Sequence, residues 1–206
     1  MFQDQRTSMM EGAVASPKIA LLILLLALSA QVGYCQSPVN ERHYEISVLG
    51  FSIGEMTANR SKSSDTTIYR VNSVVSFWFF GKVNVNFKVD SKVVDNQVVW
   101  ARSYSESNKG DFQSDVKWNG QLYEVEATNY KFENYKPILD PVGLSSVMLF
   151  FHEPKGNEDF LGEVFGIVTK VEKIKDECYE VTINGNTNRY YYDNGMMIKA
   201  EMQSPI

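Results

Sequence analysis

Apolar and polar residues alternate one by one along much of this chain. Between residues 82 and 90 the alternation is strict, and Val83, Val85, Phe87 and Val89 are separated by polar residues. Because successive side chains of a β-strand point to opposite faces, this pattern predicts strands with one buried and one solvated face. The same alternation recurs over residues 44–48, 123–128 and 196–203.

Glycine-containing turns separate the alternating segments. The Asn-Gly dipeptide favours the positive φ of two-residue hairpin turns, and it occurs at Asn119-Gly120, Asn184-Gly185 and Asn194-Gly195. We expect a mainly β protein with about ten antiparallel strands in a meander. Such a meander protects its edges by forming a curved sheet, a half-barrel or a barrel. Single glycines predict further turns at Gly50, Gly54, Gly81 and Gly110.

Residues 141–152 interrupt the alternation and predict one α-helix that covers the sheet. Asp140 is a favourable N-cap, Pro141 suits the first helical position, and Pro154 ends the helix. Two uses of the apolar stripe remain open, because it either packs in the core or lines a ligand cavity. The stripe consists of Leu144, Val147, Met148 and Phe151.

An apolar segment near the start of the chain predicts export. The ten residues from Ile19 to Leu28 are uncharged and almost all aliphatic, and they follow Lys18. This arrangement is typical of a signal peptide, here residues 1–35 with a signal helix, cleaved between Cys35 and Gln36. A single β-rich domain, residues 36–206, then remains.

Two other fates of this segment remain open. Lipidation would make Cys35 the first mature residue, although the preceding Tyr34 is bulky for that reaction. An uncleaved N-terminal anchor is the other, but the apolar run is shorter than the roughly 20 residues that span a bilayer. We expect no permanent membrane span in the mature protein. If Cys35 stays, a disulfide with Cys178 becomes available in an oxidising compartment.

Charge and motif content exclude several functions. The chain has 20 Lys+Arg against 25 Asp+Glu, so its net charge of -5 and the lack of a basic cluster argue against nucleic-acid binding. The two histidines, His43 and His152, are far apart in sequence, and neither belongs to a metal-binding motif. Glu124 and Glu126 share one face of a strand, where solvated acids are more common than a catalytic pair. We therefore assign no catalytic, metal-binding or cofactor-binding residue and expect no enzyme.

Aromatic residues give the strongest indication of binding. Phe77, Trp78, Phe79 and Phe80 place large rings on both faces of one predicted strand. A large aromatic patch is rarely left to water, so the face outside the core meets the helix, a partner, a membrane surface or an apolar ligand. We predict an apolar ligand lining made of Phe77, Trp78, Phe79, Phe80, Leu144, Met148 and Phe151.

Three segments resemble an uncharacterised family of exported Gram-negative bacterial β-proteins. They are residues 44–58 (YEISVLGFSIGEMTA), residues 140–146 (DPVGLSS) and residues 190–195 (YYYDNG). The resemblance implies a β protein of the cell envelope and supplies no catalytic residue. The hairpins with one helix are also similar, at the level of fold alone, to the half-barrels that carry lipoproteins or lipids across the periplasm.

These observations predict an exported, non-enzymatic β-domain in the periplasm or on the outer face of a Gram-negative envelope. Its expected ligand is a hydrophobic small molecule, a lipid or an envelope component. The alternative is a structural or protein-interaction module that binds another envelope protein, and the third hypothesis is a hydrolase of an envelope polymer.

Overall fold

The computed structural model describes residues 40–78, 82–108, 110–129 and 132–203. The predicted signal peptide, its cleavage site at Cys35 and Gln36, and the aromatic residues Phe79 and Phe80 lie outside the described residues. So does Gly81.

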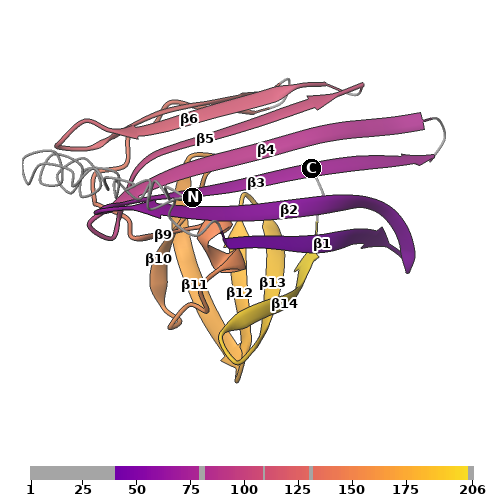
Figure 1. Ribbon diagram of the computed structural model, residues 1–206. Helices are drawn as coiled ribbons and strands as arrows, with labels where there is room; N and C mark the ends of the chain where they lie inside the picture. Colours follow the sequence, from indigo (N-terminus) through magenta and orange to yellow (C-terminus); the bar gives the residue numbers. More distant parts are fainter. Residues whose placement is uncertain (1–39, 79–81, 109, 130–131, 204–206) are drawn as a thin grey trace, which may run out of the picture. The chain divides into compact units, whose positions relative to one another are not determined.

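The first half of the domain forms an eight-stranded antiparallel meander (Figure 1). Each strand pairs with the next one along the chain, and the sheet curls into a half-barrel. Its strands are β1 (Asn40–Val48), β2 (Phe51–Ser63), β3 (Thr66–Trp78), β4 (Lys82–Val94), β5 (Gln97–Ser107), β6 (Phe112–Trp118), β7 (Tyr123–Asn129) and β8 (Phe132–Asn134).

The second half forms a six-stranded sheet in the order β14-β13-β12-β11-β10-β9. All its pairs are antiparallel except β9 with β10, which are parallel. Its strands are β9 (Leu144–Ser145), β10 (Glu158–Gly162), β11 (Ile167–Lys175), β12 (Cys178–Ile183), β13 (Asn186–Asp193) and β14 (Met196–Met202). The prediction of one sheet with about ten strands was therefore wrong. β8 and β9 span only three and two residues, too few to show a period of two.

The alternating pattern was confirmed as the basis of the sheets, but the predicted face was wrong in β14, where Met197 is buried at 5% exposure while Met196 and Ile198 are 54% and 60% exposed. Along β4, Val89, Ser91 and Val93 are buried while the residues on the other face are more exposed. Two of the Asn-Gly pairs, at 184–185 and 194–195, form the predicted two-residue turns with positive φ at both positions. The pair at 119–120 begins a four-residue loop instead, in which the Asn119 side chain accepts the N–H groups of Gln121 and Leu122.

The predicted α-helix over residues 141–152 was wrong. The segment contains the short strand β9 and then a five-residue 3-10 helix, η1 (Ser146–Phe150). Extended geometry is fixed before η1 because Val142 donates its N–H to Tyr123 Oη at 3.0 Å and accepts one from Val98 at 2.9 Å. Leu144 then pairs with Phe160 of β10.

η1 lies between the two sheets and contacts strands of both, including β3, β4, β10 and β14. Val147, Met148, Leu149 and Phe150 are all buried. A helix packed on one side of a sheet would bury a stripe, whereas η1 buries every side. The core is thus a layer shared by the two sheets with η1 inside it.

A fully buried carboxylate fixes η1 in place. Glu163, directly after β10, is 0% exposed. Its Oε1 accepts hydrogen bonds from Ser91 Oγ at 3.0 Å and from the N–H of Val147 at 3.3 Å. Its Oε2 accepts the N–H and the hydroxyl of Ser146. Burying a carboxylate is costly unless hydrogen bonds replace its water, and these four bonds do so while joining β4, β10 and η1.

We predict that Glu163→Gln destabilises the domain by about 3 kcal/mol, because one amide group replaces an oxygen and leaves two buried donors without an acceptor. Glu172→Gln is the matched control on exposed β11, with an expected change within about 0.5 kcal/mol. Denaturant unfolding measures both. Equal midpoints for the two variants would contradict the role assigned to Glu163.

Candidate functional site

The concave face of the eight-stranded sheet carries mainly apolar side chains, interrupted by buried serines such as Ser73, Ser91 and Ser105, and it is covered over only part of its length. Along β3, Tyr69 and Val71 are 4% and 2% exposed, whereas Phe77, on the same face nearer the end of the strand, is only half-buried. β4 repeats the gradient, from buried Val89 to half-buried Val83. Figure 1 shows the long strands continuing past the second sheet. Burial therefore falls where the cover of the second sheet ends.

The uncovered part forms what we call the distal concave surface. Strand pairing makes it continuous, since Phe77 lies opposite Val83, Val75 lies opposite Val85, and β2 places Ile46 next to this row through Gly54. The Phe87 ring extends it toward Phe112, with the ring centroids 6.1 Å apart. The distal concave surface consists of half-buried Ile46, Phe77, Val83, Val85 and Phe87, together with Val75, which is only 7% exposed, and buried Ser73 lies at its border opposite Phe87.

Gly54 allows the strands beneath this surface to approach closely. It lies within β2 and not in the predicted turn. A Cβ atom there would be 2.2 Å from the carbonyl oxygen of Val74 and 2.9 Å from the Cα of Val75. Any side chain at position 54 would therefore push β2 away from β3 and open the sheet at this end.

The same end of the sheet carries exposed apolar side chains on its turns and its convex face. Leu49 and Phe51, at the β1–β2 turn, are 93% and 75% exposed, and Trp78 at the end of β3 is 78% exposed. Trp78 shares the convex face with Val74, because both alternate with buried concave residues. This end of the domain thus offers apolar groups on both faces.

The structure divides the predicted ligand lining. Leu144, Met148 and Phe151 belong to the shared core, at 8%, 8% and 5% exposure. Phe77 lies on the distal concave surface, and Trp78 points to the opposite face. Of the described residues in that prediction, Phe77 is therefore the one placed on an uncovered concave surface.

A group of polar side chains lies near the covered end of the same concave face. Tyr69 Oη and His152 Nε2 share a hydrogen bond at 2.7 Å. The guanidinium carbons of Arg42 and Arg60 lie 5.3 and 5.7 Å from the centroid of the Phe151 ring, and Arg42 Nη1 donates to the carbonyl of Phe150 at 2.6 Å. We call these residues the arginine–histidine cluster.

Burial and charge change the acidities within this cluster. Desolvation lowers the pKa of His152, and the positive charges of Arg60 and Arg42 lower it further. Desolvation raises the pKa of the Tyr69 hydroxyl, while the charge of Arg60 and its hydrogen bond act in the opposite direction. Sequence reasoning missed the two arginines, although they alternate in phase with the inward residues Tyr44 and Ala58.

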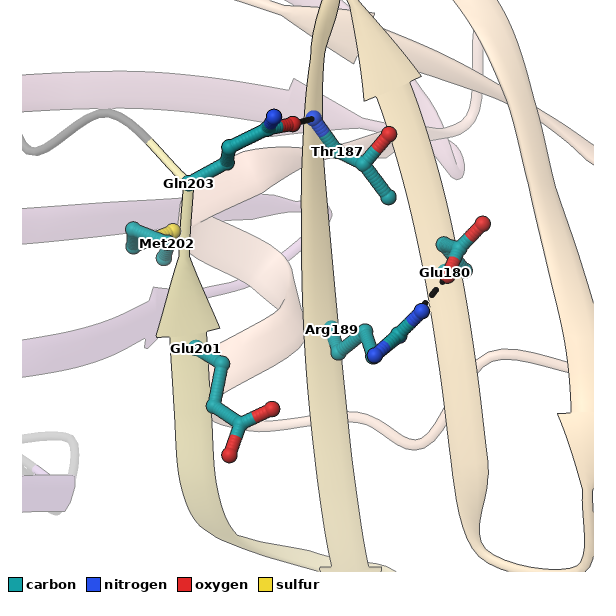
Figure 2. Close-up of a pocket in the computed structure, with 6 residues that line it drawn as sticks. All are labelled: Glu180, Thr187, Arg189, Glu201, Met202 and Gln203. Carbon is teal, nitrogen blue, oxygen red and sulfur yellow. Dashed lines mark hydrogen bonds and ion pairs between the residues drawn. The ribbon is translucent and has the colours of Figure 1, made fainter.

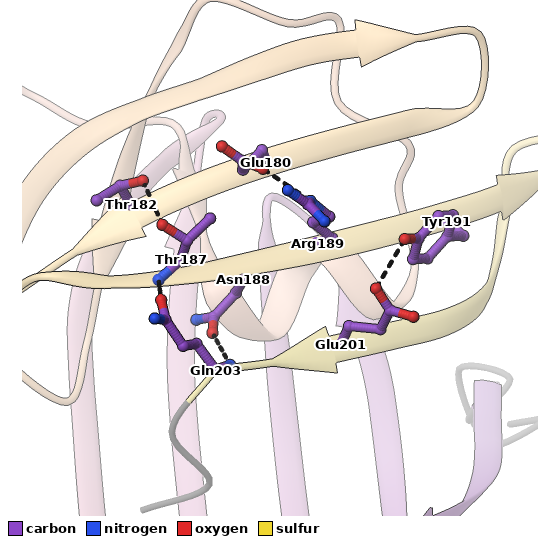
Figure 3. A network of polar contacts seen from close by, with 8 residues as sticks. All are labelled: Glu180, Thr182, Thr187, Asn188, Arg189, Tyr191, Glu201 and Gln203. Atoms are coloured by element: carbon purple, nitrogen blue, oxygen red, sulfur yellow. Dashed lines mark hydrogen bonds and ion pairs between the residues drawn. The ribbon is translucent and has the colours of Figure 1, made fainter.

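The outer face of the six-stranded sheet carries a network of exposed polar contacts (Figure 3). Arg189 Nε donates to Glu180 at 2.8 Å, and Glu201 accepts from Tyr191 at 2.8 Å and from Lys199 at 2.6 Å. The hydrogen bonds from Lys199 and then Tyr191 lower the pKa of Glu201.

A shallow pocket lies over this network (Figure 2). Its base is internally satisfied, since Arg189 already binds Glu180 and Gln203 accepts the N–H of Thr187 at 2.7 Å. These side chains offer a ligand little uncompensated charge. The lining residues are Glu180, Thr187, Arg189, Glu201, Met202 and Gln203.

The other candidate residues from the sequence are Glu124, Glu126, His43 and Cys178. Glu124 and Glu126 are exposed on β7, and Glu124 accepts from Asn119 Nδ2 at 2.9 Å. His43 lies 2.9 Å from Glu41 on the convex face of β1. Cys178 is a buried free thiol.

Neither a metal-binding cluster nor a membrane-spanning helix occurs among the residues that the structure describes. Within those ranges, no three His, Cys, Asp or Glu side chains gather closely enough to hold a metal ion. In the same ranges, no helix has the length and apolar character required to cross a bilayer.

These features define a mainly β domain in which two largely antiparallel sheets enclose a short 3-10 helix and leave part of one concave face uncovered. Residues 44–206 match the family model of DUF6134, a domain of unknown function. The chain belongs to this family, which agrees with its resemblance to an uncharacterised family. Comparisons with curated proteins and with solved structures gave no match.

We predict that His152 is less than half protonated at pH 6.5, where an ordinary histidine is half protonated, because its pKa is lowered. Arg60→Gln should raise the pKa of His152 toward 6.5, because one repelling charge is removed. Arg70→Gln, which removes a charge from an exposed ion pair with Asp90, is the control. NMR titration of the imidazole resonances measures the pKa in each protein, and identical pKa values in all three would contradict this prediction.

The lowered pKa also determines a dependence of stability on pH. Because the folded state holds a proton at His152 less tightly than the unfolded chain, unfolding takes up a proton below about pH 6.5. This contribution is present above pH 6.5 and is lost as the pH falls through the folded pKa. His152→Gln should abolish this part of the acid destabilisation in denaturant unfolding.

Proposed function

We propose that this protein is an exported, non-enzymatic β-domain that binds the acyl chain of a lipid, or a similarly flexible apolar molecule, on its distal concave surface. The observation that carries the proposal is the decline in burial along β3 and β4, from Val71 at 2% exposure to half-buried Phe77 and Val83. Where the cover ends, the inward positions of β3 and β4 remain mainly apolar, with Ser73 as the polar exception.

The chemistry of the surface supports an apolar ligand. Its six side chains, those of Ile46, Val75, Phe77, Val83, Val85 and Phe87, are hydrocarbons without hydrogen-bonding groups. Each 100 Å² of apolar surface removed from water contributes about 2.5 kcal/mol. An apolar chain that lies across the inner face of β1 to β4 would thus bind through area and shape, which favours a long flexible ligand over a compact polar one.

Binding without catalysis is supported by the state of the acidic residues. The buried acid, Glu163, has both carboxylate oxygens occupied by donors of the protein itself. The exposed pair Glu124 and Glu126 lies on β7, away from the distal concave surface. A general acid or base must reach a reacting group held in a pocket, and these carboxylates do not meet that requirement.

Export is part of the proposal and follows from the apolar segment Ile19 to Leu28. The mature protein begins at Gln36 and acts in the periplasm or at the outer face of the envelope. Intact mass measurement of the protein recovered from its native envelope determines the mature N-terminus, and the same measurement reports any acyl group on Cys35.

A second candidate function is docking to an envelope protein, and a specific observation favours it. Trp78 is 78% exposed and Val74 is 61% exposed on the convex face, where neither can contact a ligand in the concavity. An exposed tryptophan beside a second apolar side chain is typical of an interaction surface.

Phe77 and Trp78 provide a matched pair that separates the two functions, because they are neighbours in sequence on opposite faces. We predict that Phe77→Ser weakens binding of the fluorescent fatty acid cis-parinaric acid about tenfold or more, whereas Trp78→Ser changes it less than about twofold. Fluorescence titration measures both affinities, and circular dichroism confirms the fold.

The outcomes distinguish the candidates. Equal binding of the fatty acid by both variants and the wild type would overturn the lipid proposal. Loss of a cross-linked envelope protein in Trp78→Ser alone, with no fatty-acid binding by the wild type, would establish the docking function instead.

A further inference from the structure

Two arginines point into the concave face of the eight-stranded sheet. Arg42 lies opposite Ala58 in the β1–β2 pair, and Arg60 lies opposite Tyr69 in the β2–β3 pair. Ala58 and Tyr69 are 0% and 4% exposed, so this face is buried around the two cations. Arg42 and Arg60 are themselves half-buried. Charged side chains on the inner face of a sheet are rare unless they have a partner.

Neither arginine has a carboxylate partner among the residues that the structure describes. Other cations in those ranges do, including Arg70 with Asp90, Arg102 with Asp115, and Arg189 with Glu180. The acid nearest in sequence to His152, Glu153, already accepts from Tyr179 Oη at 2.8 Å. The positive charges of the two guanidinium groups therefore repel each other at a partly desolvated position. This repulsion lowers the stability of the folded state.

The two cations are held in a defined arrangement. Both approach the ring of Phe151, at 5.3 and 5.7 Å from its centroid. The carbonyl of Phe150 fixes one end of Arg42, which leaves its other N–H groups for a ligand. His152 is positioned by Tyr69 and lies close enough to both arginines for their charges to lower its pKa.

We propose that Arg42, Arg60 and His152 form a binding site for a phosphate group. Planar guanidinium groups bind phosphate through paired N–H donors. The two permanent positive charges match the charge of a phosphate monoester, which is about -1.5 to -2 at neutral pH, and His152 adds a hydrogen-bond donor beside them. An anion between the arginines removes their repulsion and, by linkage, favours the protonated form of His152.

This phosphate site is separate from the distal concave surface and goes beyond the proposed function. Tyr44 lies two residues after Arg42 on the same face, and its ring meets that of Phe150 at 5.4 Å between centroids. Tyr44 Oη also lies 3.4 Å from the carbonyl oxygen of Met197. This contact places a barrier of packed side chains between the arginines and the apolar rows.

The first test uses inorganic phosphate and the intact secreted protein. We expect phosphate to raise the pKa of His152 by about one unit and to raise the melting temperature, since a ligand that binds the folded state stabilises it. Sodium chloride at equal ionic strength should do neither. NMR titration of His152 and thermal unfolding provide two independent readouts.

Arg42→Gln and Arg60→Gln should each remove the response to phosphate, while Arg70→Gln retains it. In Arg60→Gln the lost repulsion is opposed by the lost hydrogen bond to Tyr69 and the lost contact with the Phe151 ring, so a native circular dichroism spectrum and a cooperative phosphate-free melting transition are the expected controls. These controls would show that loss of binding does not come from misfolding. Equal responses of Arg60→Gln and Arg70→Gln, or no saturable response of the wild type to phosphate, would overturn the proposal.

A third arm distinguishes a free phosphate from a lipid headgroup. Short-chain lysophosphatidic acid is compared with inorganic phosphate in the wild type and in Phe77→Ser. If the wild type binds the lipid more tightly than inorganic phosphate, and Phe77→Ser loses this difference, the site binds a lipid headgroup and is linked to the apolar surface. Equal affinities identify a site for free phosphate, and this outcome leaves the test of the distal concave surface with cis-parinaric acid unaffected.

Discussion

The position of the segment from Leu144 to Phe151 is the constraint on which the rest of the structure depends. Glu163 fixes it, because both oxygens of this buried carboxylate accept hydrogen bonds, three of which come from Ser146 and Val147 at the start of η1. η1 in turn contacts both sheets and completes the shared core. The core ends where η1 and the second sheet end, so the same hydrogen bonds that stabilise the fold also determine which part of the concave face is left uncovered.

The sequence predicted the strands well because alternation is a local property that burial on one face imposes directly. It failed at residues 141–152 for an equally physical reason. The apolar spacing of Leu144, Val147 and Met148 suits a helix, but an extended segment followed by a 3-10 turn also buries these residues. What separates the two outcomes lies elsewhere in the chain, in the hydroxyl of Tyr123 that binds Val142 and in the carboxylate of Glu163. Single-sequence patterns do not report such long-range partners.

The candidate sites show the same division between local and long-range information. Alternation alone places Phe77 and Trp78 on opposite faces, so one ligand lining could not include both. It could not reveal that Phe77 lies beyond the cover of the second sheet. Arg42 and Arg60 carried a usable signal, since each stands in phase with inward-facing residues. A charge at a position that the pattern assigns to the buried face is a local inconsistency, and such inconsistencies concentrate at functional sites.

The two proposed sites differ in what they contribute to recognition. The affinity of the distal concave surface increases with the apolar area that a ligand buries there. Such binding discriminates weakly among hydrophobic ligands. Charge pairing at the arginine–histidine cluster contributes selectivity, because a ligand without an anionic group leaves the two arginines uncompensated. The Tyr44–Phe150 contact keeps these contributions apart. A molecule that has both an apolar chain and a phosphate must therefore displace this contact or pass around it, and the energy of that rearrangement determines whether the two sites act as one.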